Sequence, residues 1–313
     1  MKAGALRSQP WLGSAVAAVV AFALTLVNGN GHGGGDLFTV ALSFSAFTIL
    51  VSLGQMLVIS AGPGNADLSI PSVIALSGAV AMIVMNGDDR MIVPGILAAT
   101  VAGMAVGAAN FGLIRLLRIP PIIATLAGSL IVMSIAINVG RGLKIKPPPQ
   151  YADLTTLRLA GIPLIAIVAL AASLAVALLL KRTLLGRSIE AVGQSERAAR
   201  LAGIAVQRTR FAVYVISAGL AGFTGALIAG FSGGNSLDQG SEYLLLTIAV
   251  VVIGGTSVSG GRASVAGIWG AAMFMFLLVA MLNAADVGAG LRMLLTGLII
   301  IGVIVAASPR KKR

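Results

Sequence analysis

The chain has no cysteine and only one histidine among its 313 residues. Without thiols it can form neither disulfides nor thiolate metal sites, and His32 alone is too few for a histidine site. We therefore expect no metal and no other cofactor. Charge is scarce as well, because Asp, Glu, Lys and Arg make up only 10% of the chain while hydrophobic residues make up 58%. Soluble domains carry about 25% charged residues, so this composition predicts an integral membrane protein.

Groupings of catalytic residues are also missing. The sequence shows no paired carboxylates and no nucleophile beside a base. The glycine-rich run 254–261 continues into Arg262, where a phosphate-binding loop needs Gly-Lys-Ser/Thr. We therefore expect that the chain is not an enzyme and that any ATP hydrolysis takes place in a separate subunit. Aromatic residues amount to 5%, which disfavours a tight sugar site of stacked rings inside the membrane.

The charge that is present is mostly positive, with a formal net charge of +12. The basic residues gather in loops and in the tail 310–313, not in the continuous patch that a nucleic acid would need. We expect anionic lipid of the inner leaflet as a partner, and no nucleic acid.

Apolar runs predict an all-α, polytopic transmembrane bundle of about ten spans, some of them short or broken, in one domain over residues 1–313. The predicted spans are residues 11–27, 37–60, 71–85, 92–116, 121–139, 162–180, 211–231, 243–254, 263–282 and 291–306. With both termini cytosolic, most of the 22 basic residues fall on the inside, as the positive-inside rule requires. A retained first helix is preferred to a signal peptide because no small-residue cleavage motif follows residues 11–27.

The segment 140–161 conflicts with this charge rule. It carries four basic residues, yet the span order places it outside. Its three consecutive prolines, 147–149, favour extended and exposed backbone. We keep the segment outside because moving it would also invert the strongly basic loop 181–210.

The loop 181–210 is the longest polar interruption in the chain, and its only acids are Glu190 and Glu196. Its charge predicts a cytosolic position. We expect Ser188 to cap a short helix that ends at Gly193, and Ser195 to cap a second helix, 196–202, which stops at a left-handed Gly203. Three residues of the second helix share one face that another surface could approach closely, namely Ala198, Leu201 and Ala202. The alternative is a solvated loop with incidental helical turns.

Two predicted spans, 71–85 and 243–254, are too short to cross a hydrocarbon layer of about 30 Å. Each borders a glycine-rich break, at 61–67 and at 254–261. Broken helices often present backbone groups to a solute in transporters, so the breaks either line a cavity or form ordinary turns near the surface.

Asp67 lies in the first break. A carboxylate near the middle of the membrane costs about 2.5–3.5 kcal/mol on insertion scales, so it must be hydrogen-bonded, paired or close to water. It could accept hydrogen bonds from a solute, or it could cap the helix that starts near Ser69. Uncharged polar residues that could line a pore suit a neutral, polyhydroxylated solute, and the candidates are Asn65, Ser69, Asn110, Thr125, Ser129 and Asn138.

Four segments resemble, in the same order, the ABC-transporter permeases of ribose/xylose-type sugar importers. They are NADLSIPSVIALSG at 65–78, RIPPIIATLAGSLIVMSIAINVGRG at 118–142, EAVGQSERAARLAGIAV at 190–206 and EYLLLTIAVVVIGGTSVSGGRASVAGIWGA at 242–271. Departures from the family pattern, such as Asn65-Ala66 in place of Gly-Ile, bear on the substrate more than on the class.

This resemblance implies the membrane-spanning subunit of an ATP-driven importer for a monosaccharide or related polyol, in the bacterial cytoplasmic (inner) membrane. It implies a cytosolic ATP-binding cassette subunit, an extracytoplasmic solute-binding protein and a second permease copy, identical or not, as partners. It assigns the coupling to the ATPase to Glu190, Gly193, Glu196, Ala198, Ala199, Leu201, Ala202 and Gly203. The runner-up is a stand-alone secondary transporter, which would need more intramembrane ionisable residues than Asp67. A membrane-embedded enzyme is the third hypothesis.

Overall fold

The computed structural model describes residues 10–28, 34–142, 145–284, 288, 290–291, 294–298 and 301–302, with the backbone alone at 10, 11, 28 and 284. Nine apolar helices match nine of the predicted spans. They are α2 (Pro10–Asn28), α3 (Gly34–Ser60), α4 (Ile70–Met85), α5 (Ile92–Leu117), α6 (Pro121–Gly140), α8 (Leu164–Arg182), α11 (Val206–Phe231), α12 (Tyr243–Ile253) and α13 (Val265–Ala284). Half of the last predicted span, 291–306, falls outside the described residues, and the basic tail lies wholly outside them.

Within the described residues, six helices are long and apolar enough to cross a membrane. The spans in α4 and α12 are shorter, as the sequence predicts, with 16 and 11 residues. At 1.5 Å per residue these helices extend over only about 24 and 16 Å. The loop elements between the spans are η1 (Asp89–Met91), α7 (Pro149–Thr156), β1 (Arg158–Leu159), β2 (Ile162–Pro163), α9 (Leu184–Gln194) and α10 (Glu196–Leu201), with β1 and β2 forming an antiparallel pair.

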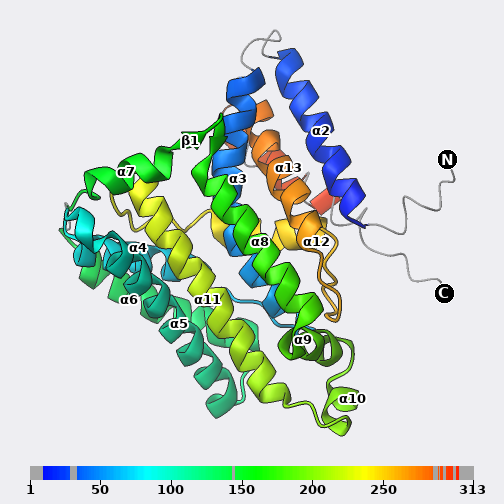
Figure 1. The fold of residues 1–313 in the computed structure, drawn as a ribbon. Helices are drawn as coiled ribbons and strands as arrows, with labels where there is room; N and C mark the ends of the chain where they lie inside the picture. Colours follow the sequence, from blue (N-terminus) through cyan, green and yellow to red (C-terminus); the bar gives the residue numbers. More distant parts are fainter. Residues whose placement is uncertain are drawn as a thin grey trace, which may run out of the picture.

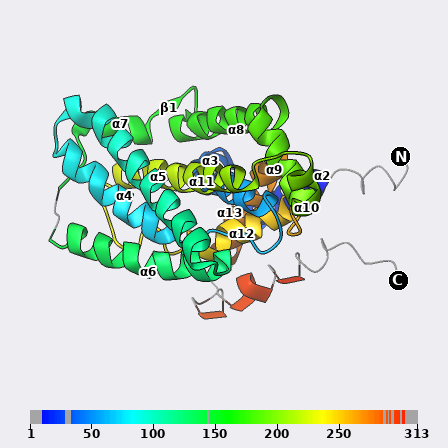
Figure 2. The ribbon, with the colours of Figure 1, turned by 90° about the horizontal axis from the view of Figure 1, so that it is seen from below.

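Helix α3 is the centre of the bundle. Every residue from Ser45 to Ser60 is buried, which explains why the helix is apolar on all sides rather than along one stripe. Helices α8, α11, α12 and α13 all pack against it. Helices α4, α5 and α6 extend the bundle beyond α11, and α2 covers α13 (Figures 1 and 2).

The two polar regions lie at opposite ends of the molecule. Figure 1 shows α9 and α10 at one end of the bundle, and α7 with β1 at the other. The sequence-based expectation that 140–161 and 181–210 lie on opposite sides agrees with this arrangement.

The expectation that the prolines 147–149 are exposed is wrong for the first two and confirmed for Pro149. Pro148 has the expected extended backbone (φ −52°, ψ 142°), but Pro147 and Pro148 are buried. Pro149 opens α7, where proline is favoured because the first helical N–H has no partner. Behind it, Tyr151 packs against Gly230 of α11, and this burial raises the pKa of the phenol. The prolines thus turn the chain back onto the bundle.

Candidate functional site

The loop 181–210 folds into two short helices, α9 and α10, which we call the knob (residues 184–201). The predicted cap at Ser188 is wrong. Helix α9 begins earlier, where the Thr183 hydroxyl oxygen accepts a hydrogen bond from the Gly186 amide at 3.1 Å. Ser188 lies inside the helix and donates to the Leu184 carbonyl. Gly193 does not end α9 either, because the helix continues to Gln194. Thr183 takes over as the cap because it has extended backbone and directly follows α8.

The signals for α10 are confirmed. The Ser195 hydroxyl oxygen accepts from the Ala198 amide at 3.2 Å, and Gly203 adopts a left-handed φ of +80°. The helix ends one residue before the predicted boundary, at Leu201.

The knob has a buried side and an exposed side. Ala199 is 3% exposed and packs with Val192 and Val206, so it fixes α10 onto the rest of the chain. The face formed by Ala198, Leu201 and Ala202 is uncovered, and Leu201 is 83% exposed. The chain itself therefore leaves a small apolar face accessible at this polar end.

Glu196 connects the knob to α11. Its carboxylate accepts hydrogen bonds from Arg200 at 2.7 Å and from Arg210 at 2.8 Å. The pair with Arg200 lies within one helix turn and contributes little by itself. The pair with Arg210 links α10 to the first turns of α11. Arg210 lies beyond the knob and was not predicted as a partner of Glu196.

Gly193 lies where three distant segments meet. A Cβ at this position would overlap the Ser60 carbonyl, at the end of α3, and the Gly261 amide, in the α12–α13 loop. Gly261 itself donates a hydrogen bond to the Ser60 carbonyl at 2.9 Å. Gly260 and Gly261 have φ values of +84° and +75°, which glycine adopts without strain. We call this contact the glycine junction (60–62, 193–194 and 260–261), and it connects the knob to both breaks.

The first break, between α3 and α4, contains Asp67, which is 2% exposed. One of its oxygens, Oδ1, accepts from the Ser69 amide at 3.0 Å and from the Ser69 hydroxyl at 2.6 Å. Asn110 of α5 donates to the Ser69 hydroxyl oxygen at 2.7 Å. In this conformation the carboxylate therefore holds Ser69, the residue directly before α4, but it does not cap the first-turn amides of that helix.

Side chains from other helices satisfy the backbone of the first break. The Leu68 amide donates to Thr125 Oγ1 of α6, and the Asp67 amide donates to Gln55 Oε1 of α3, both at 3.1 Å. Tyr214 of α11 donates to Asn65 Oδ1 at 3.4 Å. Gln55 and Tyr214 were missed by the sequence analysis. A single glutamine inside the apolar run 37–60 was the available signal for the first of them.

The predicted pathway residues thus fall into two groups. Five of them meet in this buried network, namely Asn65, Asp67, Ser69, Asn110 and Thr125. Ser129 joins its edge by a hydrogen bond to Ser72 at 3.2 Å. Asn138 does not join, because it is exposed and lies 13 residues beyond Thr125 on α6, about 20 Å along the helix.

The network keeps unused hydrogen-bonding capacity. Asp67 Oδ2 and Gln55 Nε2 are buried and have no hydrogen-bond partner within the described part of the chain. Buried polar atoms are normally paired, so this acceptor and this donor are available to a polar ligand or to water. Because Asn65, Asp67 and Ser69 are buried in this conformation, a solute could reach them only after a rearrangement.

Sequence comparisons place this architecture in a known family. A family model described as the permease component of the branched-chain amino acid transport system matches residues 37–304. The chain belongs to this family. Over 269 residues the permease is 32% identical to the probable ABC transporter permease protein y4mJ of Sinorhizobium fredii, covering 85% of this chain and 79% of the relative.

Two further relatives carry a substrate in their names. The permease is 33% identical to the fructose import permease protein FruF of Bifidobacterium longum, over 78% of this chain and 69% of the relative. It is 30% identical to the L-arabinose ABC transporter permease protein AraH of Azospirillum brasilense, over 71% of this chain and 65% of the relative. No solved structure matches the permease.

Proposed function

We propose that this permease is the membrane-spanning subunit of an ATP-driven importer for a neutral monosaccharide or related polyol. The class of solute follows from the names of the fructose and L-arabinose relatives and from the uncharged polar side chains around Asp67. The observation that supports coupling is the knob, which exposes Leu201 on one side and is connected to both breaks through the glycine junction on the other.

The proposed importer contains three partners besides this chain. A cytosolic ATP-binding cassette subunit docks on Ala198, Leu201 and Ala202, and an extracytoplasmic solute-binding protein delivers solute at the end that carries α7. A second copy of the permease, identical or related, completes the pathway in the bacterial inner membrane. Both termini lie on the cytosolic side in this arrangement.

In the proposed cycle, closure of the ATPase pushes on the exposed face of α10. The push passes through Ala199 and through the Glu196–Arg210 ion pair into α11. The movement of the knob is also transmitted at Gly193 to the end of α3 and the α12–α13 loop. These backbones are in direct contact because glycine has no side chain to separate them. Because both breaks meet at the glycine junction, they are expected to move together. Their movement would open the network around Asp67 to the solute.

The experiment that tests this proposal compares variants in proteoliposomes with the candidate ATPase and binding protein. Leu201→Arg places a charge on the docking face and should lower ATP-driven uptake more than about tenfold, with an unchanged melting temperature. Leu117→Arg is the matched control, because Leu117 is also exposed (60%) but lies at the end of α5, away from the knob. It should retain uptake.

Ala199→Trp probes the buried side of the same helix. Since Ala199 packs inside the chain, the larger side chain should displace α10, lowering both the melting temperature and uptake. Full coupling in Leu201→Arg would contradict the docking face. Uptake by the permease alone, driven by an ion gradient without ATP, would instead favour a secondary transporter.

A further inference from the structure

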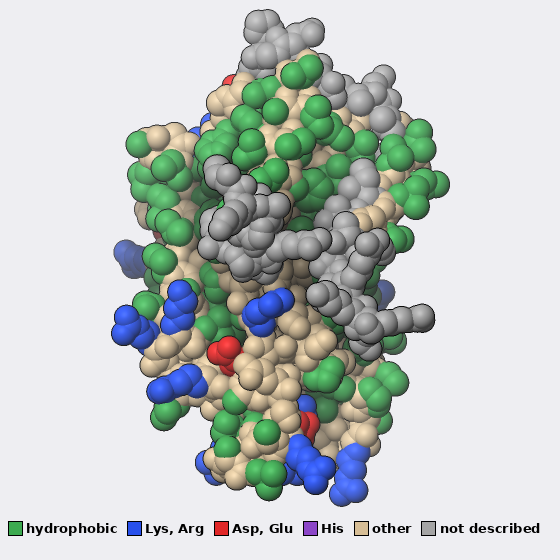
Figure 3. Space-filling model, turned by 90° about the vertical axis from the view of Figure 1, so that its right-hand side faces the viewer, with side chains coloured by type: hydrophobic (Ala, Val, Ile, Leu, Met, Phe, Trp, Pro, Cys, Tyr) green, Lys and Arg blue, Asp and Glu red, His purple; other side chains and the backbone are tan. Residues whose placement is uncertain are grey.

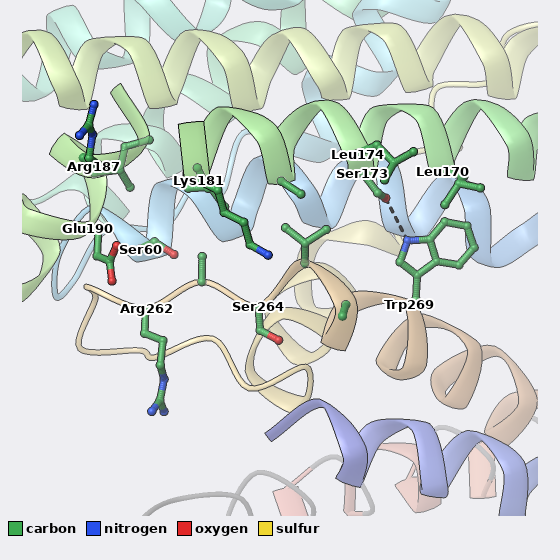
Figure 4. Close-up of a pocket in the computed structure, with 16 residues that line it drawn as sticks. Ser60, Leu170, Ser173, Leu174, Lys181, Arg187, Glu190, Arg262, Ser264 and Trp269 are labelled. Atoms are coloured by element: carbon green, nitrogen blue, oxygen red, sulfur yellow. Dashed lines mark hydrogen bonds between the residues drawn. The ribbon is translucent and has the colours of Figure 1, made fainter. Parts of the chain in front are cut away.

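A cleft of about 700 Å³ lies on one side of the bundle, between α8, α9 and the start of α13. It is separate from the network around Asp67, and none of the functions proposed above uses it. Figure 4 shows α8 along one wall and the α12–α13 loop with the first turn of α13 along the other. Ser60, at the glycine junction, lies at its inner edge.

The cleft changes in character along its length. One half is apolar and includes Leu170, Leu174 and Trp269. At its far end the Trp269 indole N–H donates to the Ser173 hydroxyl oxygen at 2.9 Å, which joins α13 to α8 (Figure 4). The opposite half holds Lys181, in the last turn of α8. Leu170 and Lys181 are 11 residues apart, which corresponds to about 16 Å along the helix.

The polar half carries an excess of positive charge. Lys181, Arg187 and Arg262 line it, against the single acid Glu190. In Figure 4 the Lys181 side chain points into the cleft, while the two arginines point away from its centre at the rim. Among the described residues no hydrogen bond or ion pair is found for these three basic side chains. Three cations are thus gathered at one end of an apolar groove, with no partner in the part of the chain that the structure describes.

The groove is open to the surface that faces lipid. Leu170, Leu174 and Leu178 of α8 are 49%, 57% and 60% exposed, as expected for a span whose outer side contacts acyl chains. Figure 3 shows the same division over this face of the molecule, with hydrophobic side chains in the upper part and basic side chains in the lower part. Lys and Arg at this depth attract the anionic lipids of the cytoplasmic leaflet.

We propose that this cleft binds one anionic phospholipid of the inner leaflet. Its phosphate lies at Lys181, whose side chain points into the cleft, with Arg262 at the rim adding positive charge, and one acyl chain lies against Leu174 and Trp269. A free sugar would leave the apolar half unfilled. The terminal segments of the chain are poor occupants because both are basic, with Lys2 and Arg7 at one end and the run 310–313 at the other. This proposal depends on a membrane location and not on the ATP-driven function.

Trp269 provides a local probe of this site. The chain has two tryptophans, so Trp11→Phe leaves Trp269 as the only indole. We would place this variant in nanodiscs of zwitterionic lipid that contain an increasing fraction of brominated phosphatidylglycerol or brominated phosphatidylcholine. Bromine quenches tryptophan on contact, so the mole fraction at half-maximal quenching reports occupancy of the cleft.

Phosphatidylglycerol should quench at a clearly lower mole fraction than phosphatidylcholine. Lys181→Gln or Arg262→Gln should each raise that fraction about five-fold, the effect of one basic side chain near an anionic surface. Glu190→Gln should lower it, because it removes the acid from the cleft. Arg182→Gln is the matched control. Arg182 is exposed and adjacent in sequence, but it does not line the cleft, so the preference should be retained.

Equal quenching by the two lipids would overturn the proposal, as would a preference that survives Lys181→Gln and Arg262→Gln together. If neither lipid quenched Trp269, acyl chains would not enter the cleft. This result would also overturn the proposal and would favour a protein segment as the occupant. Size-exclusion chromatography checks that Trp11→Phe is folded. Native mass spectrometry of the unaltered chain gives an independent reading, in which phosphatidylglycerol should be retained in preference to phosphatidylcholine.

Discussion

The two breaks in the bundle are both glycine-rich, but they are held together in different ways. The first break, at 61–67, is buried except at Pro63 and Gly64, and side chains of α3, α5, α6 and α11 satisfy the polar groups of the break and of Leu68 and Ser69 after it. The second, at 254–264, is partly exposed and is organised mainly by its own backbone. Its Ser257 amide donates to the Arg262 carbonyl, and its Gly260 amide donates to the Ser257 carbonyl.

The first break therefore contributes polar side chains, whereas the second contributes a closely approaching backbone. The first break presents a carboxylate and several amide and hydroxyl groups, so its side chains determine what it can bind. The second break has little side-chain chemistry, and its glycines allow it to approach Ser60 and Gly193 closely. We infer that the first break recognises the solute and that the second transmits movement. The following predictions test this division, from the largest expected effect to the smallest.

Gly261→Ala should have the largest effect. The left-handed backbone costs alanine about 1–2 kcal/mol, and overlap of the new Cβ with the Gln194 backbone adds about 1–3 kcal/mol. We expect a large drop in melting temperature and loss of uptake. Gly64→Ala is the control, because Gly64 has a similar φ of +73° with no atom within 4 Å of the added Cβ. Equal losses in the two variants would show that the junction contact is unimportant.

Asp67→Ala should lower uptake more than about tenfold while the protein still inserts. The change leaves the buried Ser69 amide without its acceptor, at a cost of about 1–3 kcal/mol, and removes the acceptor available to a solute. Asp67→Asn keeps one oxygen and should retain more activity. Transport assays on purified, correctly folded variants measure the difference, and near-normal uptake by Asp67→Ala would refute a recognition role for the first break.

Thr125→Val should have an intermediate effect. Valine has nearly the same shape but cannot accept the hydrogen bond from the Leu68 amide, so we expect a loss of stability of about 1–2 kcal/mol. Ser134→Ala on the same helix removes only an exposed hydroxyl bonded to its own helix backbone. Denaturation in detergent should therefore separate the two variants. Similar denaturation midpoints for the two variants would argue that α6 does not support the first break.

Ser257→Ala should be nearly neutral, within about 0.5 kcal/mol, because Ser257 supports the second break through its backbone. Ser257→Pro removes the amide that donates to Arg262 and should lower both stability and uptake. If the alanine variant were as impaired as the proline variant, side-chain chemistry would matter in the second break as well.

Local signals in the sequence located most of the helices. Apolar runs predicted α5 and α6 to within one residue at each end, and the Ser195 cap with the Gly203 stop was read correctly. The sequence could not indicate which side of α10 would be buried. In a six-residue helix that choice depends on Val192 and Val206, which lie outside it. The Ser188 cap failed for a similar reason, since the equally suitable Thr183 lies closer to the end of α8.

The sequence by itself determined that this is a helical membrane protein with short spans and a basic loop, because hydropathy and charge act locally along the chain. Only the tertiary structure decided that residues 60, 193 and 261 meet, that Asn110 and Thr125 join the polar groups of the first break, and that Lys181 and Arg262 line one cleft. These contacts join positions more than 40 residues apart, and the packing of the helices brings them together. No local pattern encodes which small or polar residues will then face each other.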